Sequence, residues 1–280
     1  MSEVLGGQFI VESKPGAGGN IAATYVARSA PDGYQMFLAG DHHATNTFLN
    51  STLPYHPVTD FEPVSLIASN PQLLVAKKSI PAKDLKELVE WVKANQDKIS
   101  AGTAGAGAAS HVSGVYFQSV TNTKFTFVPY RGTGPALQDV VAGNLDLMFD
   151  QAASALPQVR NGNVRAFAVT AKNRLASEPN IPTVDEAGMP GFYIAVWHAL
   201  WFPKGTPKDI VAKLNAEVVR GVGTTEFRER LRALGADATG STVEDFSAFI
   251  RAEARLDRRH SRPVRCPGGA AAAHCAMGRV

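Results

Sequence analysis

Short apolar segments alternate with helix-like segments along most of this chain, and glycine-rich loops join several of them. Residues 8–13 and 34–40 have the pattern of β-strands. Residues 20–30, between them, have the pattern of a helix that ends at the Pro-Asp-Gly turn of residues 31–33. Strand, helix and strand in this order predict a βαβ unit with parallel strands. The predicted fold class is therefore α/β.

A second series of strands and helices begins at residue 99 and continues to about residue 171. The clearest helix of the chain, residues 82–96, precedes it, and Asp84 and Glu87 have the spacing of a capping box. An apolar strand within residues 192–202 and three helical segments follow. The chain has 280 residues, which is long enough for two domains of roughly 100–150 residues.

The charge distribution argues against a nucleic-acid partner. The formal net charge is +3, but residues 255–280 hold six arginines and one acid, so residues 1–254 carry a net charge of −2. Both cysteines, Cys266 and Cys275, lie in the basic segment and make no metal-ligand set. No apolar run approaches the roughly 18 residues of a membrane span, and the first residues lack the pattern of a signal peptide.

The loop at residues 15–20, Pro-Gly-Ala-Gly-Gly-Asn, lies between a predicted strand and a predicted helix. That position suits a phosphate-binding loop, but the last glycine of the dinucleotide fingerprint and the Lys-Ser/Thr pair of a P-loop are missing. Two other interpretations are favoured over a nucleotide. The loop is either a tight turn that lets strand and helix pack closely, or an anion site formed by free N–H groups at a helix start.

The segment at residues 103–111, Thr-Ala-Gly-Ala-Gly-Ala-Ala-Ser-His, repeats this arrangement in the second series. Two such loops could face each other across a cleft and would suit a ligand with two negative ends. Asp150 ends a predicted strand, where open α/β sheets place ligand-binding groups. A carboxylate at that position can equally cap a helix or a turn.

The familiar catalytic and metal-binding patterns do not occur in the sequence. There is no Gly-x-Ser-x-Gly elbow, and Ser110 and His111 are adjacent, which is a poor geometry for a nucleophile and its base. His42 and His43 would point to opposite faces of an extended chain, so loop or capping histidines are favoured over metal ligands. We therefore expect neither catalytic residues nor a metal site.

Several segments, in order, resemble the solute receptors of tripartite tricarboxylate transporters, the Bug-type extracytoplasmic binding proteins. The resemblance extends from about residue 4 to about residue 254. The segments that carry it are residues 11–40, 53–68, 128–170, 181–192 and 202–218.

The resemblance implies a type II periplasmic-binding-protein fold, in which two α/β domains close around a ligand cleft. Domain I would comprise residues 1–97 and 196–254, and domain II residues 98–195. The family implies no reaction and no cofactor. It implies a monomeric periplasmic receptor that captures a small carboxylate (a di- or tricarboxylate, an acidic amino acid or an aromatic acid) for integral membrane transporter subunits. The residues that it assigns to ligand binding are His42, His43, Asn46, Thr103, Ala108, Ala109, Ser110, His111 and Asp150.

Three features depart from the family pattern. The chain opens near the end of the family's first helix, so we expect the first strand, its Pro-Gly-Gly loop and the signal peptide to be missing, which would weaken domain I. Ala108 and Val115 stand where the family commonly has Ser or Thr and often has Glu, respectively. The apolar pattern of the last helix stops near Ala254, so we interpret residues 255–280 as a frameshifted or disordered tail.

Two other functions compete with the receptor. A hydrolase would use Ser110 and His111, and ester or amide turnover that is lost in Ser110→Ala would support it. A cytoplasmic small-molecule sensor would agree with the missing export signal, but such regulators usually carry a helix-turn-helix, and none precedes residue 8. The receptor is the function that the sequence favours.

Overall fold

The computed structural model describes residues 6–41, 43–44 and 53–260 of the chain. Within these residues eight strands form one sheet, and two of them, β6 (Val164–Val169) and β8 (Asp237–Ala238), pair with β2 off its main path. The order along the main path is β1 (Phe37–Gly40), β7 (Ala195–Pro203), β2 (Phe61–Lys77), β5 (Leu147–Gln151), β3 (Ser100–Thr103) and β4 (Thr126–Pro129).

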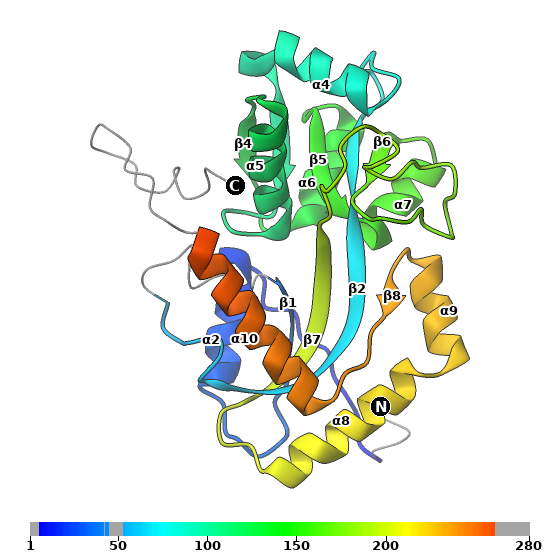
Figure 1. Ribbon diagram of the computed structural model, residues 1–280. Coiled ribbons are helices and arrows are strands. Elements are labelled where there is room, and N and C mark those ends of the chain that lie inside the picture. The colour runs from blue at the N-terminus through cyan, green and yellow to red at the C-terminus, as the bar shows by residue number, and fades with distance from the viewer. Residues whose placement is uncertain (1–5, 42, 45–52, 261–280) are drawn as a thin grey trace, which may run out of the picture.

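The strand β2 runs through the whole molecule and links two lobes (Figure 1). Residues 61–71 pair with β7, whereas residues 72–77 pair with β5 and β6. The sequence predicts two strands here, separated near Asn70 and Pro71. The structure has one strand that changes its partners at that point.

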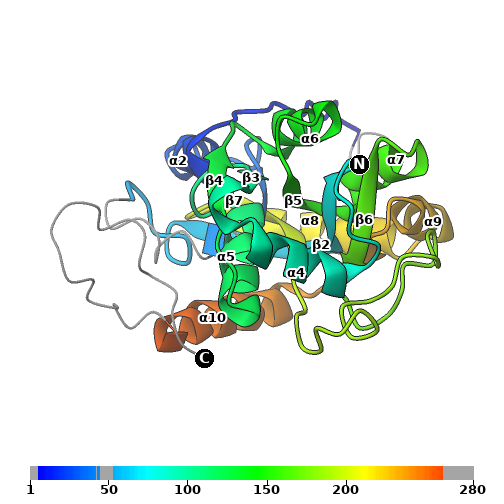
Figure 2. The ribbon, with the colours of Figure 1, turned by 90° about the horizontal axis from the view of Figure 1, so that it is seen from above.

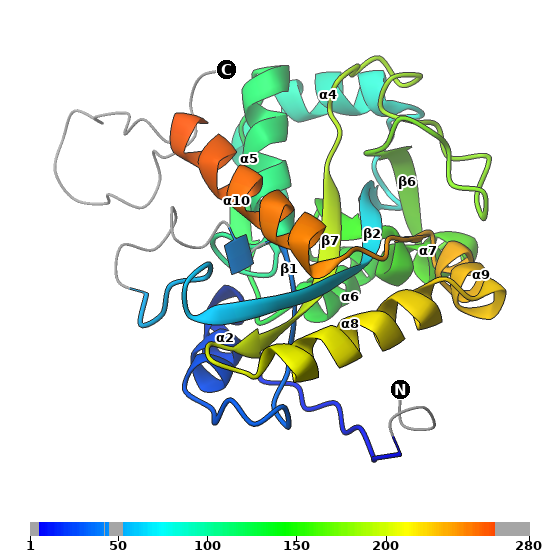
Figure 3. The ribbon, with the colours of Figure 1, turned by 60° about the horizontal axis from the view of Figure 1, so that its bottom comes forward.

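We call the elements around the beginning of β2 the first lobe. Its helices are η1 (Ala17–Gly19), α2 (Asn20–Ala27), α8 (Lys208–Val222), α9 (Thr225–Ala233) and α10 (Val243–His260), and its strands are β1, β7 and β8. One core cluster joins α2 and α10 to β1 and β7, and another joins α8 to the opposite face of β7. Figure 3 accordingly shows α10 and α8 on the two sides of these strands.

We call the elements around the end of β2 the second lobe. Its helices are α4 (Leu85–Ala94), η2 (Gln96–Lys98), α5 (Ala109–Thr121), α6 (Thr133–Ala142) and α7 (Ala152–Arg160), and its strands are β3, β4, β5 and β6. One core cluster holds α4 and α5, and the other holds α6 and α7. The two pairs of helices therefore cover opposite faces of the sheet (Figure 2).

The start of α4 shows how local sequence sets an element. The Asp84 carboxylate accepts a hydrogen bond from the Glu87 N–H at 2.8 Å, and the Glu87 carboxylate accepts one from the Lys83 N–H at 2.8 Å. These bonds satisfy donors that a helix start leaves free. Leu85 and Leu88 are then buried on one face, so the prediction of an amphipathic, capped helix is confirmed.

Two local predictions differ from the structure. Residues 8–13 form no strand, and Ile10 and Val11 are 82% and 92% exposed, because no neighbouring strand pairs with them among the described residues. The last helix, α10, continues to His260, past the end of the apolar pattern at residue 254. Residues 261–280 lie outside the described part, so the disordered tail stays a prediction.

The proposed division into two domains also stays a prediction. The sequence places its first boundary at residues 97 and 98, whereas α4 and the end of β2 pack with the second lobe.

Over residues 6–41, 43–44 and 53–260, no helix is both long and apolar enough to cross a bilayer.

Candidate functional site

The second glycine-rich loop connects β3 to α5, as the sequence predicts. Gly105 and Gly107 have φ values of 104° and 81°, which L side chains rarely adopt, so the loop needs glycine at both positions. Ala108 is the N-cap of α5 and has no side chain that could satisfy the first amides. In the described part of the chain, the N–H groups of Ala109 and Ser110 have no hydrogen-bond partner. This helix start is therefore available to an anion.

The polar side chains of this loop hold its backbone. Ser110 is 3% exposed, and its hydroxyl accepts a hydrogen bond from the Ala104 N–H at 3.0 Å. The Thr103 hydroxyl, also buried, accepts one from the Gly105 N–H at 3.3 Å. The Nδ1 atom of His111 accepts one from the Gly107 N–H at 3.4 Å. These bonds shape the loop rather than activate a nucleophile.

Asp150 lies at the end of β5, buried to 1% exposure. Its carboxylate accepts hydrogen bonds from the Ser154 hydroxyl at 2.6 Å and from the Gln151 N–H at 2.9 Å, and these bonds hold the turn that leads into α7. Burial raises the pKa of the Asp150 carboxyl, although bonds from Ser154, Thr133 and Gln151 favour its ionised form. The geometry matches the capping interpretation, and a ligand-binding role stays a prediction.

Of the two histidines that follow β1, His42 and His43, the structure describes only His43. His43 is 2% exposed and packs in the aromatic core, with its ring centroid 4.6 Å from that of Phe61 and 4.9 Å from that of Trp201. The ring therefore lies in the core of the first lobe, and its assignment to the ligand site stays a prediction. His42 and Asn46 lie outside the described residues.

The first glycine-rich loop packs on the helix that follows it, but no strand precedes it among the described residues, so the predicted packing of strand against helix does not form there. A Cβ atom on Gly16 would lie 2.9 Å from the Ile21 side chain, so a larger residue would disturb the contact between loop and helix. Gly19 is the N-cap of α2 and has a left-handed φ of 89°.

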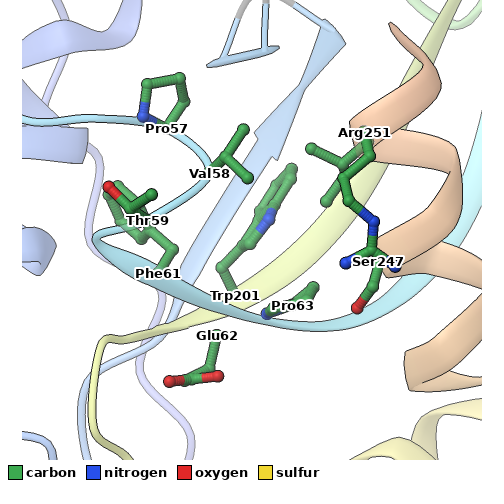
Figure 4. Close-up of a pocket in the computed structure, with 10 residues that line it drawn as sticks. Pro57, Val58, Thr59, Phe61, Glu62, Pro63, Trp201, Ser247 and Arg251 are labelled. Carbon is green, nitrogen blue, oxygen red and sulfur yellow. The ribbon is translucent and has the colours of Figure 1, made fainter. Parts of the chain in front are cut away.

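A cavity of about 270 Å³ lies on the first lobe, between the start of β2, β7 and α10. Figure 4 shows the Trp201 ring in its wall, between Val58 on one side and Arg251 on the other. Among the predicted ligand-binding residues that the structure describes, none lines this cavity. Its walls combine apolar side chains with Thr59, Glu62, Ser247 and Arg251, and it is separate from the start of α5.

Sequence reasoning missed a group of polar residues where the lobes meet. Gln151 accepts a hydrogen bond from Asn70 at 3.4 Å, and its Oε1 lies 3.0 Å from Nε2 of His198. Gln72, 1% exposed, binds the Ser113 hydroxyl of α5 through its side chain. The signal was present, since His198 interrupts an apolar strand, and Asn70 and Gln72 lie in the polar break at residues 69–72 of β2.

Metal binding finds no support in the described residues, where no group of three or more His, Cys, Asp or Glu side chains could hold an ion. The candidate site thus consists of backbone donors at the start of α5, with buried polar residues beside it where the lobes meet.

The sequence model of one family, described as the tripartite tricarboxylate transporter family receptor, matches residues 1–260. The chain belongs to this family. Its members are solute-binding proteins rather than enzymes, so the hydrolase alternative is wrong. The predicted resemblance to Bug-type receptors is confirmed.

Three solved structures show the same fold. The periplasmic binding protein BugD is 38% identical, with a TM-score of 0.87 over 92% of this chain and 88% of BugD. MatC from Rhodopseudomonas palustris, solved with bound malate, is 38% identical, with a TM-score of 0.85 over 91% and 88%. Rpa4515 from R. palustris, solved with adipate, is 33% identical, with a TM-score of 0.90 over 98% and 89%. The periplasmic-binding-protein fold is therefore confirmed.

Proposed function

We propose that this protein captures a small dicarboxylate between its lobes and delivers it, as a monomer in the periplasm, to the membrane subunits of a tripartite tricarboxylate transporter. The observation that carries the proposal is the start of α5, where two adjacent N–H groups have no partner in the described part of the chain. Such a helix start binds a carboxylate through both its donors and its dipole.

The ligand class is supported by the relatives as well as by the loop. MatC was solved with malate and Rpa4515 with adipate, and both ligands carry two carboxylates. A backbone site suits several carboxylates, because N–H donors recognise the carboxylate and not the carbon chain between its ends. Other residues of the cleft must then distinguish ligands by the length of their carbon chain and by their substituents.

A proline substitution at Ala109 tests the site directly. Ala109 is the first residue of α5, where proline is tolerated, and the extended φ and ψ of Ala108 suit a residue before proline. Ala109→Pro therefore removes one donor while keeping the helix. We expect carboxylate affinity to fall by about 10- to 100-fold, because a hydrogen bond to a charged group contributes about 1.5–3 kcal/mol.

Thr225→Pro is the matched control, since Thr225 is exposed and is the first residue of α9. Titration calorimetry with malate and adipate would compare the three proteins, after thermal unfolding has shown which carboxylates stabilise the wild type. Equal affinity in Ala109→Pro and the wild type would rule out the start of α5 as the carboxylate site. A wild type indifferent to every carboxylate would contradict the proposed function.

A further inference from the structure

The side chain of Gln151 joins the two lobes. Gln151 ends β5 in the second lobe, whereas Asn70 and His198 lie on β2 and β7 in the part of these strands that belongs to the first lobe. The Gln151 Oε1 atom lies 3.0 Å from His198 Nε2 and accepts a hydrogen bond from Asn70 at 3.4 Å. One carboxamide oxygen therefore serves two residues of the other lobe.

The direction of these bonds follows from the chemistry of the groups. A carboxamide oxygen can only accept, so the Nε2 atom of His198 carries the hydrogen. Burial lowers the pKa of the His198 imidazole, which keeps the ring neutral near pH 7. Asn70 is 3% exposed, so its amide depends on a protein partner for this bond.

The contact lies beside the two chain crossings between the lobes. The Thr170 hydroxyl oxygen lies 2.5 Å from the carbonyl oxygen of Ile194 and 3.0 Å from that of Gln72, so its one hydrogen can bond to either, and it accepts from the Gln72 N–H at 2.9 Å. Thr170 thus ties together the two strands where they leave the second lobe. We therefore expect any bending between the lobes to occur on the first-lobe side of these bonds, which is where Asn70 and His198 lie.

We propose that Gln151 is a positioning residue that holds the lobes together, so that its bonds to His198 and Asn70 set how long a ligand stays bound. The inference rests on the proposed function for its ligand, but its effect on the lobes does not need one. In this proposal, opening the lobes separates Gln151 from His198 and Asn70, and closing them restores both bonds. Loss of the carboxamide oxygen therefore favours the open form whether or not the cleft is occupied.

The first experiment measures the lobes without ligand. Gln151→Leu and His198→Phe keep side-chain size while removing the acceptor or the donor. Small-angle X-ray scattering should give each variant a larger radius of gyration than the wild type. The double variant should match Gln151→Leu, because that substitution already removes the bond to His198. Gln158→Leu is the control, since the Gln158 amide binds Asn163 inside the second lobe.

An unchanged radius in Gln151→Leu would overturn the proposal, and so would an equal expansion in Gln158→Leu. The second experiment follows release of malate or adipate by stopped-flow. Dissociation from Gln151→Leu should be about tenfold faster than from the wild type. Equal rates in the two proteins would overturn the role in ligand retention. If the wild type binds neither ligand, the proposed function fails, and the scattering result alone decides whether Gln151 holds the lobes.

Discussion

Ser113→Ala is the substitution for which the structure makes the sharpest stability prediction. Ser113 is fully buried in α5, and its hydroxyl donates to the Gln72 side-chain oxygen, itself in a residue 1% exposed. The same hydroxyl also lies 2.8 Å from the Ala109 carbonyl oxygen. Alanine removes the donor and leaves the Gln72 oxygen buried beside a methyl group.

The expected loss of stability follows from the Gln72 side-chain oxygen, which is left without a donor. A buried oxygen that loses its donor costs about 1–3 kcal/mol, whereas removing both partners of a hydrogen bond costs much less. We therefore expect Ser113→Ala to lower the free energy of unfolding by about 1–3 kcal/mol. Adding Gln72→Met should recover part of that loss, which would appear as a coupling of about 1–2 kcal/mol in a double-mutant cycle.

Urea unfolding followed by circular dichroism would measure all four proteins, with an unchanged m value as the test of a common unfolding transition. Ser247→Ala is the matched control, because that hydroxyl makes the same kind of bond to a backbone carbonyl, that of Val243 at 2.7 Å. The control should cost less than about 0.5 kcal/mol, as is usual away from buried networks. The reasoning is refuted if Ser113→Ala costs no more than Ser247→Ala, or if the two network substitutions are additive.

Other substitutions test the cores and the pH dependence. Phe246→Ala empties a fully buried position between two tryptophan rings and should cost about 3–5 kcal/mol in urea unfolding; a loss below 1 kcal/mol would contradict this packing. Gly114→Ala would place a Cβ atom about 2.5 Å from the Phe127 ring, so we expect a loss of about 1–3 kcal/mol, and a neutral result would exclude the close contact. Burial raises the pKa of Asp150 above the unfolded value of about 3.9, so its stabilising contribution at low pH is lost as pH rises through the raised pKa. Asp150→Asn should therefore lose less stability than the wild type as pH rises above about 4, and identical pH profiles would contradict the shift.

Much of the fold could be predicted from local sequence, because the relevant forces act over a few residues. The Asp84–Glu87 capping box fixes the start of α4 without help from distant parts of the chain. The Gly105 and Gly107 positions need left-handed backbone, which the sequence reveals through glycine itself. Even the change of partners along β2 appears in the sequence as a break near Pro71.

Predictions failed where a segment depends on a partner. Residues 8–13 have the composition of a strand, but a strand exists only when another pairs with it, and Val11 is 92% exposed here. The resemblance assigns His43 to the ligand site, which stays a prediction, but nothing in the sequence indicates that aromatic rings surround it. Its burial depends on Tyr55, Phe61 and Trp201, which come from other parts of the chain.

The residues that join the lobes show that a sequence can indicate where a residue needs a partner from a distant part of the chain. His198 interrupts an apolar strand and Asn70 lies in the polar break of β2, and a buried polar group in such a strand is costly unless it finds a partner. In the pairing of β2 with β7, Asn70 lies opposite Val196, two residues from His198. Two polar side chains this close together in the sheet are expected to share a partner. That partner, Gln151, follows directly after Asp150, whose carboxylate holds the Gln151 N–H. Asp150 drew attention to the end of β5 in the sequence, and the next residue, Gln151, makes the contact between the lobes.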